Sequence, residues 1–128
     1  TSKMALSIVD DIIDSKRVIN GVNIVTYNVE NMDMNSLRDL GDKIRDRLES
    51  CLVVLASIKD GKISFVAMAT KDLIEKGIHA GNIIREVAKV TGGGGGGRPD
   101  MAQAGGKDPS KVDEALNIVS TIVTSQIK

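Results

Sequence analysis

The chain has 128 residues, and its seventeen basic side chains balance seventeen acidic ones, which excludes a global electrostatic field that attracts nucleic acid. This length suits one domain with its own core, and a single cysteine excludes an internal disulfide framework. Neither a signal-peptide pattern nor an apolar run of about 18 residues is present, so we expect a soluble, cytoplasmic domain that makes no membrane contact.

An amphipathic helix is predicted for Lys3–Ser15, because apolar residues recur there at helical spacing. These residues are Met4, Leu6, Ile8, Val9, Ile12 and Ile13. The segments Arg17–Ile19 and Val22–Val29, joined by the turn Asn20–Gly21, predict a strand region. We therefore expect an N-terminal helix that leads into a β-sheet.

A second helix is predicted after Asn35 or Ser36, either of which can serve as its N-cap. Its apolar side consists of Leu37, Leu40, Ile44 and Leu48. After this helix, Cys51–Ile58 and Lys62–Ala69 lie on either side of a short turn that contains Asp60 and Gly61. This is the clearest hairpin pattern in the chain.

Three further helices are predicted in the second half of the chain. Thr70 is expected to cap a short helix that ends near Gly77, and Asn82–Val90 forms the next one. Asp108 and the following proline begin a closing helix at about Pro109–Ile127. These elements predict an α/β (α+β) domain, with a small mixed or antiparallel sheet and helices on one of its faces.

Glycine is concentrated in one segment, Gly92–Gly106, which contains eight of the chain's thirteen glycines, six of them consecutive. Each ordered glycine costs about 0.5–1 kcal/mol relative to alanine. The run therefore costs several kcal/mol in a domain whose net stability is only about 5–15 kcal/mol. Such a segment is either a linker whose order is unimportant or a backbone that must come close to a partner.

We interpret the glycine segment as an ordered recognition loop between two helices, because its sequence is too specific for a linker. The run is followed by Arg98, Pro99, Asp100 and Gln103, whereas flexible linkers continue as low-complexity sequence. Consecutive glycine N–H groups can form a concave anion site, and an arginine beside them can bind a phosphate with two hydrogen bonds.

The sequence GGGGGGRPDMAQAGGK, residues 92–107, resembles the signature loop of the C-terminal domain of alanyl-tRNA synthetases. This domain is called C-Ala and belongs to the DHH-associated domain family. The segments His79–Lys89 and Val112–Ile127 also fit, so the resemblance extends from about Val18 to the end of the chain. Some family members carry a lysine within the glycine run, and this chain does not.

The resemblance implies a fragment of a longer protein, which agrees with a chain that begins at Thr1 and lacks an initiator methionine. Residues 1–16 would end a helical connector, and residues 17–128 would form the globular domain. The implied partners are tRNA(Ala), contacted at its outer corner, the other domains of the same synthetase, and a second copy in a homodimer. The full-length protein would be an ATP-dependent alanine–tRNA ligase, with ATP, Mg and Zn confined to its other domains.

The residues themselves indicate no catalytic or metal site in this chain. His79 is the single histidine, it has no nucleophile or ligand partner in the pattern, and we expect it to form a structural hydrogen bond. Cys51 stands in an apolar run and is expected to be a small buried hydrophobic residue. We therefore expect the fragment alone to be non-catalytic and to need no cofactor.

RNA binding is the function that the residues favour, through the shape and backbone of a folded RNA. Tyr27 and Phe65 are the only aromatic residues, which are too few to stack several unpaired bases. The candidate RNA-binding residues combine local positive charge with bare backbone. They are Arg85, Lys89, Gly94, Gly95, Gly96, Gly97, Arg98, Gln103, Lys107 and Lys111.

Alternative functions remain open at this point. The same domain could be attached to a free-standing alanyl-tRNA editing hydrolase, or it could serve purely for dimerisation. The related accessory domain of DHH-type phosphoesterases and exonucleases typically has a histidine after the glycines, where this chain has Arg98 and Pro99. That difference argues against those enzymes.

Overall fold

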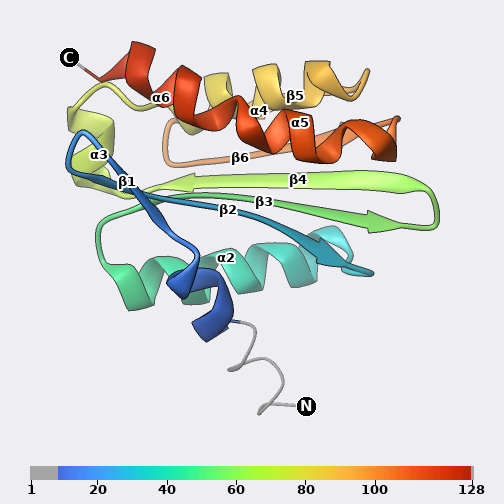
Figure 1. Ribbon diagram of the computed structural model, residues 1–128, viewed down its shortest axis with the longest axis horizontal. Coiled ribbons are helices and arrows are strands. Elements are labelled where there is room, and N and C mark those ends of the chain that lie inside the picture. The colour runs from blue at the N-terminus through green and yellow to red at the C-terminus, as the bar shows by residue number, and fades with distance from the viewer. Residues whose placement is uncertain (1–8, 128) are drawn as a thin grey trace.

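The computed structural model describes residues 9–127 and contains a six-stranded mixed sheet in the order β1-β2-β3-β4-β6-β5 (Figure 1). The strands are β1 (Arg17–Ile19), β2 (Val22–Glu30), β3 (Leu52–Lys59), β4 (Lys62–Ala69), β5 (Gly94–Gly97) and β6 (Met101–Gly106). The helices are α2 (Met34–Leu48), α3 (Lys71–Glu75), α4 (Ala80–Val90), η1 (Pro109–Lys111), α5 (Val112–Asn117) and α6 (Val119–Gln126). Residues 9–14 are also helical, and the earlier part of the predicted Lys3–Ser15 helix lies outside the described residues.

Both predicted turns between strands are confirmed. Asn20 and Gly21 have φ values of 51° and 79°, and Asp60 and Gly61 have φ values of 53° and 76°. Two consecutive residues with positive φ match the twist of the adjoining antiparallel strands, so they favour tight hairpins. The pair β2 and β3 is parallel, because α2 connects them, and all other neighbouring strands are antiparallel.

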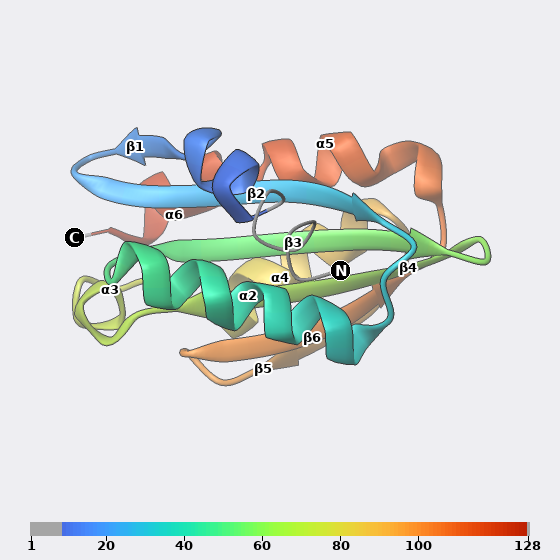
Figure 2. The same cartoon turned by 90° about the horizontal axis from the view of Figure 1, so that it is seen from below.

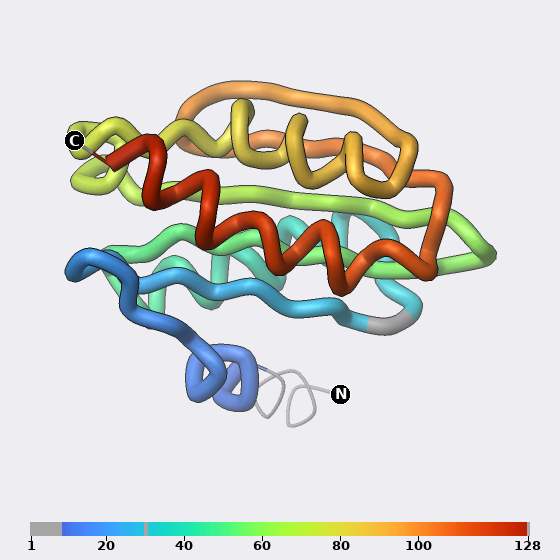
Figure 3. The backbone as a smooth tube through the Cα atoms, turned by 45° about the horizontal axis from the view of Figure 1, so that its top comes forward, coloured from blue at the N-terminus to red at the C-terminus, as the bar shows by residue number. Residues whose placement is uncertain are grey.

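The prediction that helices cover one face of the sheet is wrong, because helices lie on both faces (Figure 3). On one face, α2 and residues 9–14 pack against β2, β3 and β4, and on the other face α4, α5 and α6 form a second cluster. The physical reason lies in β3, whose residues 52–56 are all buried. A continuous apolar run supplies side chains to both faces, and each face then needs a cover.

The predicted N-cap of α2 is also wrong. The structural N-cap is Asp33, whose Oδ1 accepts a hydrogen bond of 2.8 Å from the backbone N–H of Ser36. Asn35 and Ser36 therefore lie within the first turn of the helix rather than before it. The buried residues of α2 include three of the four predicted apolar positions, namely Leu37, Leu40 and Ile44.

The helices in the second half follow the predicted order. Gly77, with a φ of 106°, lies just after α3, and α4 begins at Ala80, two residues before the predicted start. The closing helix is divided into η1, α5 and α6, and Asp108 caps it by accepting a hydrogen bond from the N–H of Ser110. Within residues 9–127, no helix has the length and apolar character needed to cross a membrane.

Candidate nucleic-acid interface

The glycine run forms β5, the strand at one edge of the sheet, so the prediction of a loop between two helices is wrong. It pairs with β6 from Gly94 opposite Gly105 to Gly97 opposite Ala102. Glycine is a poor strand former, which is why its pattern indicates a loop. Here the pairing with β6 and the packing of α4 against β5 define the conformation.

Alternate glycines of the run have different structural reasons to be glycine. A Cβ atom on Gly95 would lie 2.5 Å from the Cα of Ala104, and one on Gly97 would lie 2.8 Å from the Cα of Ala102. A Cβ on Gly94 or Gly96 would meet nothing within 4 Å. Packing therefore requires glycine at positions 95 and 97 but does not explain the glycines at positions 94 and 96.

The turn that follows β5 is held by backbone hydrogen bonds. The N–H of Arg98 donates to the carbonyl of Met101 at 3.0 Å, and the carbonyl of Arg98 accepts from the N–H of Gly81 at 3.2 Å. The carbonyl of Pro99 accepts from the N–H of Ala80 at 3.0 Å. These bonds fix the backbone of Arg98, while the residue as a whole is exposed.

The N-terminus of α4 has no free N–H groups for an anion in its first turn. The N–H groups of Ala80 and Gly81 donate to the turn, and that of Asn82 donates to Nδ1 of His79 at 3.0 Å. The predicted structural role of His79 agrees with this cap. A phosphate in this region must therefore be bound by other groups.

Four of the predicted RNA-binding residues lie on one face of the sheet at its β5 edge. Side chains alternate between faces along a strand, and Met101 packs in the same cluster as α2. Gln103 lies two positions after Met101 and therefore shares its face, together with its pairing partner Gly96. Gly94 and Arg98, two positions before and after Gly96, lie on the same face. Lys107 follows β6 directly.

Among residues 9–127, no helix covers this face at its β5 edge. Helix α2 packs on β3 and β4, and Figure 2 shows β5 outside the cover of α2. Gly94, Gly96 and Arg98 are all exposed, and Gln103 is half-buried. We call the surface formed by β5, β6 and the adjoining part of β4 on the α2 side the open face.

The other predicted basic residues lie elsewhere. Arg85 and Lys89 follow Gly81 at intervals of four residues, so they lie on the side of α4 that borders β5. Nη2 of Arg85 donates to Oδ1 of Asn82 at 2.7 Å, and Nζ of Lys89 is 3.4 Å from Oε1 of Glu86. Lys111 belongs to η1, where its Nζ is 3.8 Å from a carboxylate oxygen of Glu114 on α5.

A hollow of about 480 Å³ lies at the start of β5, whereas Arg98 follows the end of this strand. It is lined by two lysines, Lys62 and Lys107, together with Gly61, Ile63, Gly93, Gly94, Gly105 and Gly106. Lys62, which begins β4 directly after the Asp60–Gly61 turn, is not among the residues that the sequence pattern indicates. Its proximity to the glycine segment depends on β6 pairing with β4, which the sequence pattern does not reveal.

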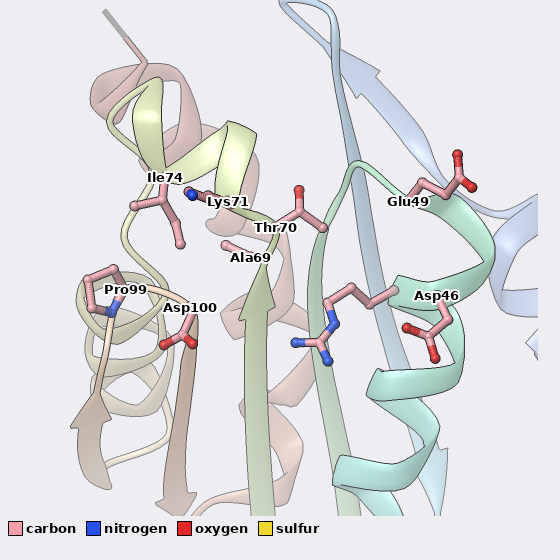
Figure 4. A pocket seen from close by; sticks show the side chains of 9 residues that line it. Asp46, Glu49, Ala69, Thr70, Lys71, Ile74, Pro99 and Asp100 are labelled. Atoms are coloured by element: carbon pink, nitrogen blue, oxygen red, sulfur yellow. The ribbon is translucent and has the colours of Figure 1, made fainter.

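A larger hollow of about 730 Å³ lies next to the turn after β5, where Pro99 and Asp100 line it (Figure 4). Its charged lining residues are Arg45, Asp46, Glu49, Lys71 and Asp100. Figure 4 shows Asp46 on α2, Glu49 directly after that helix, Lys71 at the start of α3 and Asp100 in the turn after β5. Since carboxylates outnumber cations here, this hollow does not favour an anionic ligand.

The single cysteine lies in the core. Cys51 is fully buried, and burial raises the pKa of its thiol to about 11, so the thiol is protonated at neutral pH. Among residues 9–127, no three His, Cys, Asp or Glu side chains are placed to hold a metal ion.

Comparison with known proteins identifies similar sequences and folds. Residues 21–125 match the DHHA1 domain family. The chain is 56% identical over 127 residues to the alanine–tRNA ligase of Clostridioides difficile and 56% identical over 126 residues to that of Acetivibrio thermocellus. The matches cover 99% and 98% of this chain, respectively, but only 14% of the length of each relative.

Solved structures give the same result for the fold. The C-Ala domain from Aquifex aeolicus alanyl-tRNA synthetase is 37% identical, with a TM-score of 0.79, and the match covers 86% of this chain and 98% of that one. RecJ from Thermus thermophilus has a TM-score of 0.67 at 10% identity, and the match covers 97% of this chain and 18% of that one. The second similarity concerns the fold alone.

Proposed function

The chain belongs to the DHHA1 domain family, in the group of C-Ala domains of alanyl-tRNA synthetases, and from this premise we propose that it is the tRNA-binding C-terminal domain of an alanine–tRNA ligase. Its partner is tRNA(Ala), contacted at the outer corner. The observation that carries the proposal is the exposed glycine strand next to Arg98, in which Gly94 and Gly96 have no packing reason to be glycine. A bare backbone next to a cation allows close approach of a phosphate.

The proposed mode of recognition is the shape and backbone of the folded RNA. Phe65 is fully buried, and Tyr27 packs against the cluster that includes α2, so neither ring is available as a platform for several bases. The chain has no other aromatic residue. Base reading by stacking is therefore not part of the proposal.

In the longer ligase, this domain contributes binding rather than chemistry. ATP, Mg and Zn belong to the other domains, where the alanine–tRNA ligase reaction takes place. A weak contact that is tethered to the aminoacylation and editing domains raises the effective concentration of the bound tRNA at each of them. The domain would thereby help both reactions act on one bound tRNA.

A salt titration of RNA binding tests the proposal. We expect the chain to bind folded tRNA(Ala) more tightly than an unfolded transcript or a plain duplex, and Arg98→Ala to weaken that binding. The slope of log affinity against log salt should be shallow, at about 0.7–0.9 for each phosphate contact. Arg17→Ala on β1, at the opposite edge of the sheet, is the matched control and should bind as the unchanged chain does.

Three results would contradict the proposal. Equal, steeply salt-dependent binding to all three RNAs would indicate a general electrostatic contact. No RNA binding, together with concentration-dependent self-association in sedimentation, would favour the competing proposal that the domain serves for homodimerisation. A parent protein with editing activity alone would indicate the free-standing hydrolase.

A further inference from the structure

We infer that the RNA backbone lies across the open face, between Arg98 at one end and the pair Lys62 and Lys107 at the other. This inference rests on the proposed function and specifies which surface performs it. It adds Lys62, from the β3–β4 hairpin, to the residues that contact RNA. It also excludes the α4 side of β5, where Arg85 and Lys89 lie, from the contact.

The strand register and a shared hollow bring the three cations to the two ends of the open face. Ile63 pairs with Gly106 at the end of β6, and Lys62 and Lys107 are the residues next to this pair in the sequence. Both line the same hollow of about 480 Å³. Arg98 lies opposite Met101 at the far end of β5 and β6, and Met101 packs on the α2 side.

The charge of the open face complements a phosphate backbone. Along β4, β5 and β6, the positions on this face carry lysine, serine, valine, methionine, glutamine, glycine and arginine, without any aspartate or glutamate. In the described residues 9–127, Arg98, Lys62 and Lys107 form no ion pair with a carboxylate. Lys89, by contrast, is paired with Glu86.

Along β5, the floor between the two charged ends carries no side chains. Gly94 and Gly96 are exposed, and a Cβ on either would meet nothing within 4 Å. Gly105, opposite Gly94, is exposed as well. Absent side chains let a sugar–phosphate chain approach the sheet, and this need explains the two glycines that packing does not.

The length of the open face indicates contact with more than one phosphate. Gly93 and Arg98 are five strand positions apart, which corresponds to about 16 Å at 3.3 Å per residue. Arg98 and the lysine pair therefore bind different phosphates. Removal of one end should weaken binding and reduce its salt dependence without abolishing either.

The test compares single variants on the two sides of β5, with folded tRNA(Ala) as the probe. Lys62→Gln and Lys107→Gln should each lower the affinity and reduce the salt slope by about 0.7–0.9. Arg85→Gln and Lys89→Gln should bind as the unchanged chain does. Lys16→Gln, an exposed lysine just before β1, is the matched control for removal of one lysine charge.

A second variant tests the bare floor without removing charge. Gly96→Val places a side chain in open space on a strand, where valine is favourable, so the fold should be retained with an unchanged or higher melting temperature. Binding to tRNA(Ala) should nevertheless be lost or strongly reduced. Unaltered binding by Gly96→Val would contradict the inference.

The outcomes separate this inference from the proposed function. If folded tRNA(Ala) binds but Lys62→Gln matches Lys16→Gln, while Arg85→Gln and Lys89→Gln lose affinity, the RNA lies on the α4 side and the inference is wrong. The proposed function would then stand. If the unchanged chain does not bind tRNA(Ala) and Gly96→Val alters self-association, the open face binds a second copy of the chain. The inference and the proposed function are then both wrong.

Discussion

Gly81 in α4 lies directly against Gly97 in β5, so that a Cβ atom on Gly81 would be 2.5 Å from the carbonyl oxygen of Gly97. In addition, the N–H of Gly81 donates to the carbonyl of Arg98. The helix thus supports the last residue of the glycine strand and the first residue of the turn. The position of Arg98 depends on this contact.

Gly81→Ala should therefore destabilise the domain. Alanine is a better helix former than glycine by about 1 kcal/mol, but the added methyl group overpacks the contact with β5, which typically costs about 1–3 kcal/mol. Urea denaturation should show a lower midpoint. Gly41→Ala is the matched control, because there the new Cβ would lie 3.0 Å from Sδ of Met68, a flexible side chain that can move. An equal loss of stability in both variants would contradict this explanation.

Alternate glycines of β5 should respond differently to alanine. Gly95→Ala should lower stability by about 1–3 kcal/mol, because its Cβ would collide with Ala104. Gly96→Ala has open space and should leave stability unchanged or raise it by up to about 1 kcal/mol, since alanine reduces the entropy of the unfolded chain. Thermal and urea unfolding of the pair measure the difference. Similar losses in both would mean that packing accounts for the whole run.

The sequence predicts the elements whose signals are local. The turns Asn20–Gly21 and Asp60–Gly61, and the apolar side of α2, depend on a few neighbouring residues and are confirmed. The glycine strand is not predictable in this way, because its conformation comes from pairing with β6 and packing against α4. Lys62 is not predictable either, because its position next to the glycine segment depends on the pairing of β4 with β6.

The sequence predicts only part of the candidate site. The motif identifies Arg98, Gln103 and Lys107 as candidates, but it does not say that Arg85 and Lys89 lie on the other side of β5. The strand register places Gln103 on the α2 side, and the packing of Gly81 on β5 places Arg85 and Lys89 on the α4 side. Charge alone groups the four basic residues together, and the sheet separates them.

Removal of the His79 side chain should weaken α4. Nδ1 of His79 accepts a hydrogen bond of 3.0 Å from the N–H of Asn82, and loss of such an N-cap costs about 1 kcal/mol. His79→Ala should therefore lower the urea midpoint, while His79→Asn, which also caps helices well, should retain most of the stability. If both variants unfold at the same midpoint, the cap contributes little.

Asp72 should contribute to stability against acid. Hydrogen bonds from the hydroxyl of Ser50 and then of Thr70 lower the pKa of its carboxyl group below the usual 3.8. A lowered pKa in the folded state means that this stabilisation is present above about pH 4 and is lost as the pH falls through the lowered value. Asp72→Asn should show a smaller decrease in melting temperature on acidification, and an unchanged decrease would contradict the prediction.

Cys51 should make the fold less stable at high pH. Burial raises the pKa of its thiol from 9.0 to about 11, so the unfolded chain releases the thiol proton at a lower pH than the folded chain. Stability is therefore unaffected by this group below about pH 9 and declines between pH 9 and 11. Because lysines also titrate there, the measurement is the difference between the unchanged chain and Cys51→Ala in urea midpoints across that range. The variant should start from a lower midpoint, owing to the lost buried sulfur, and should decline less steeply. Parallel curves would show that the thiol is not the titrating group.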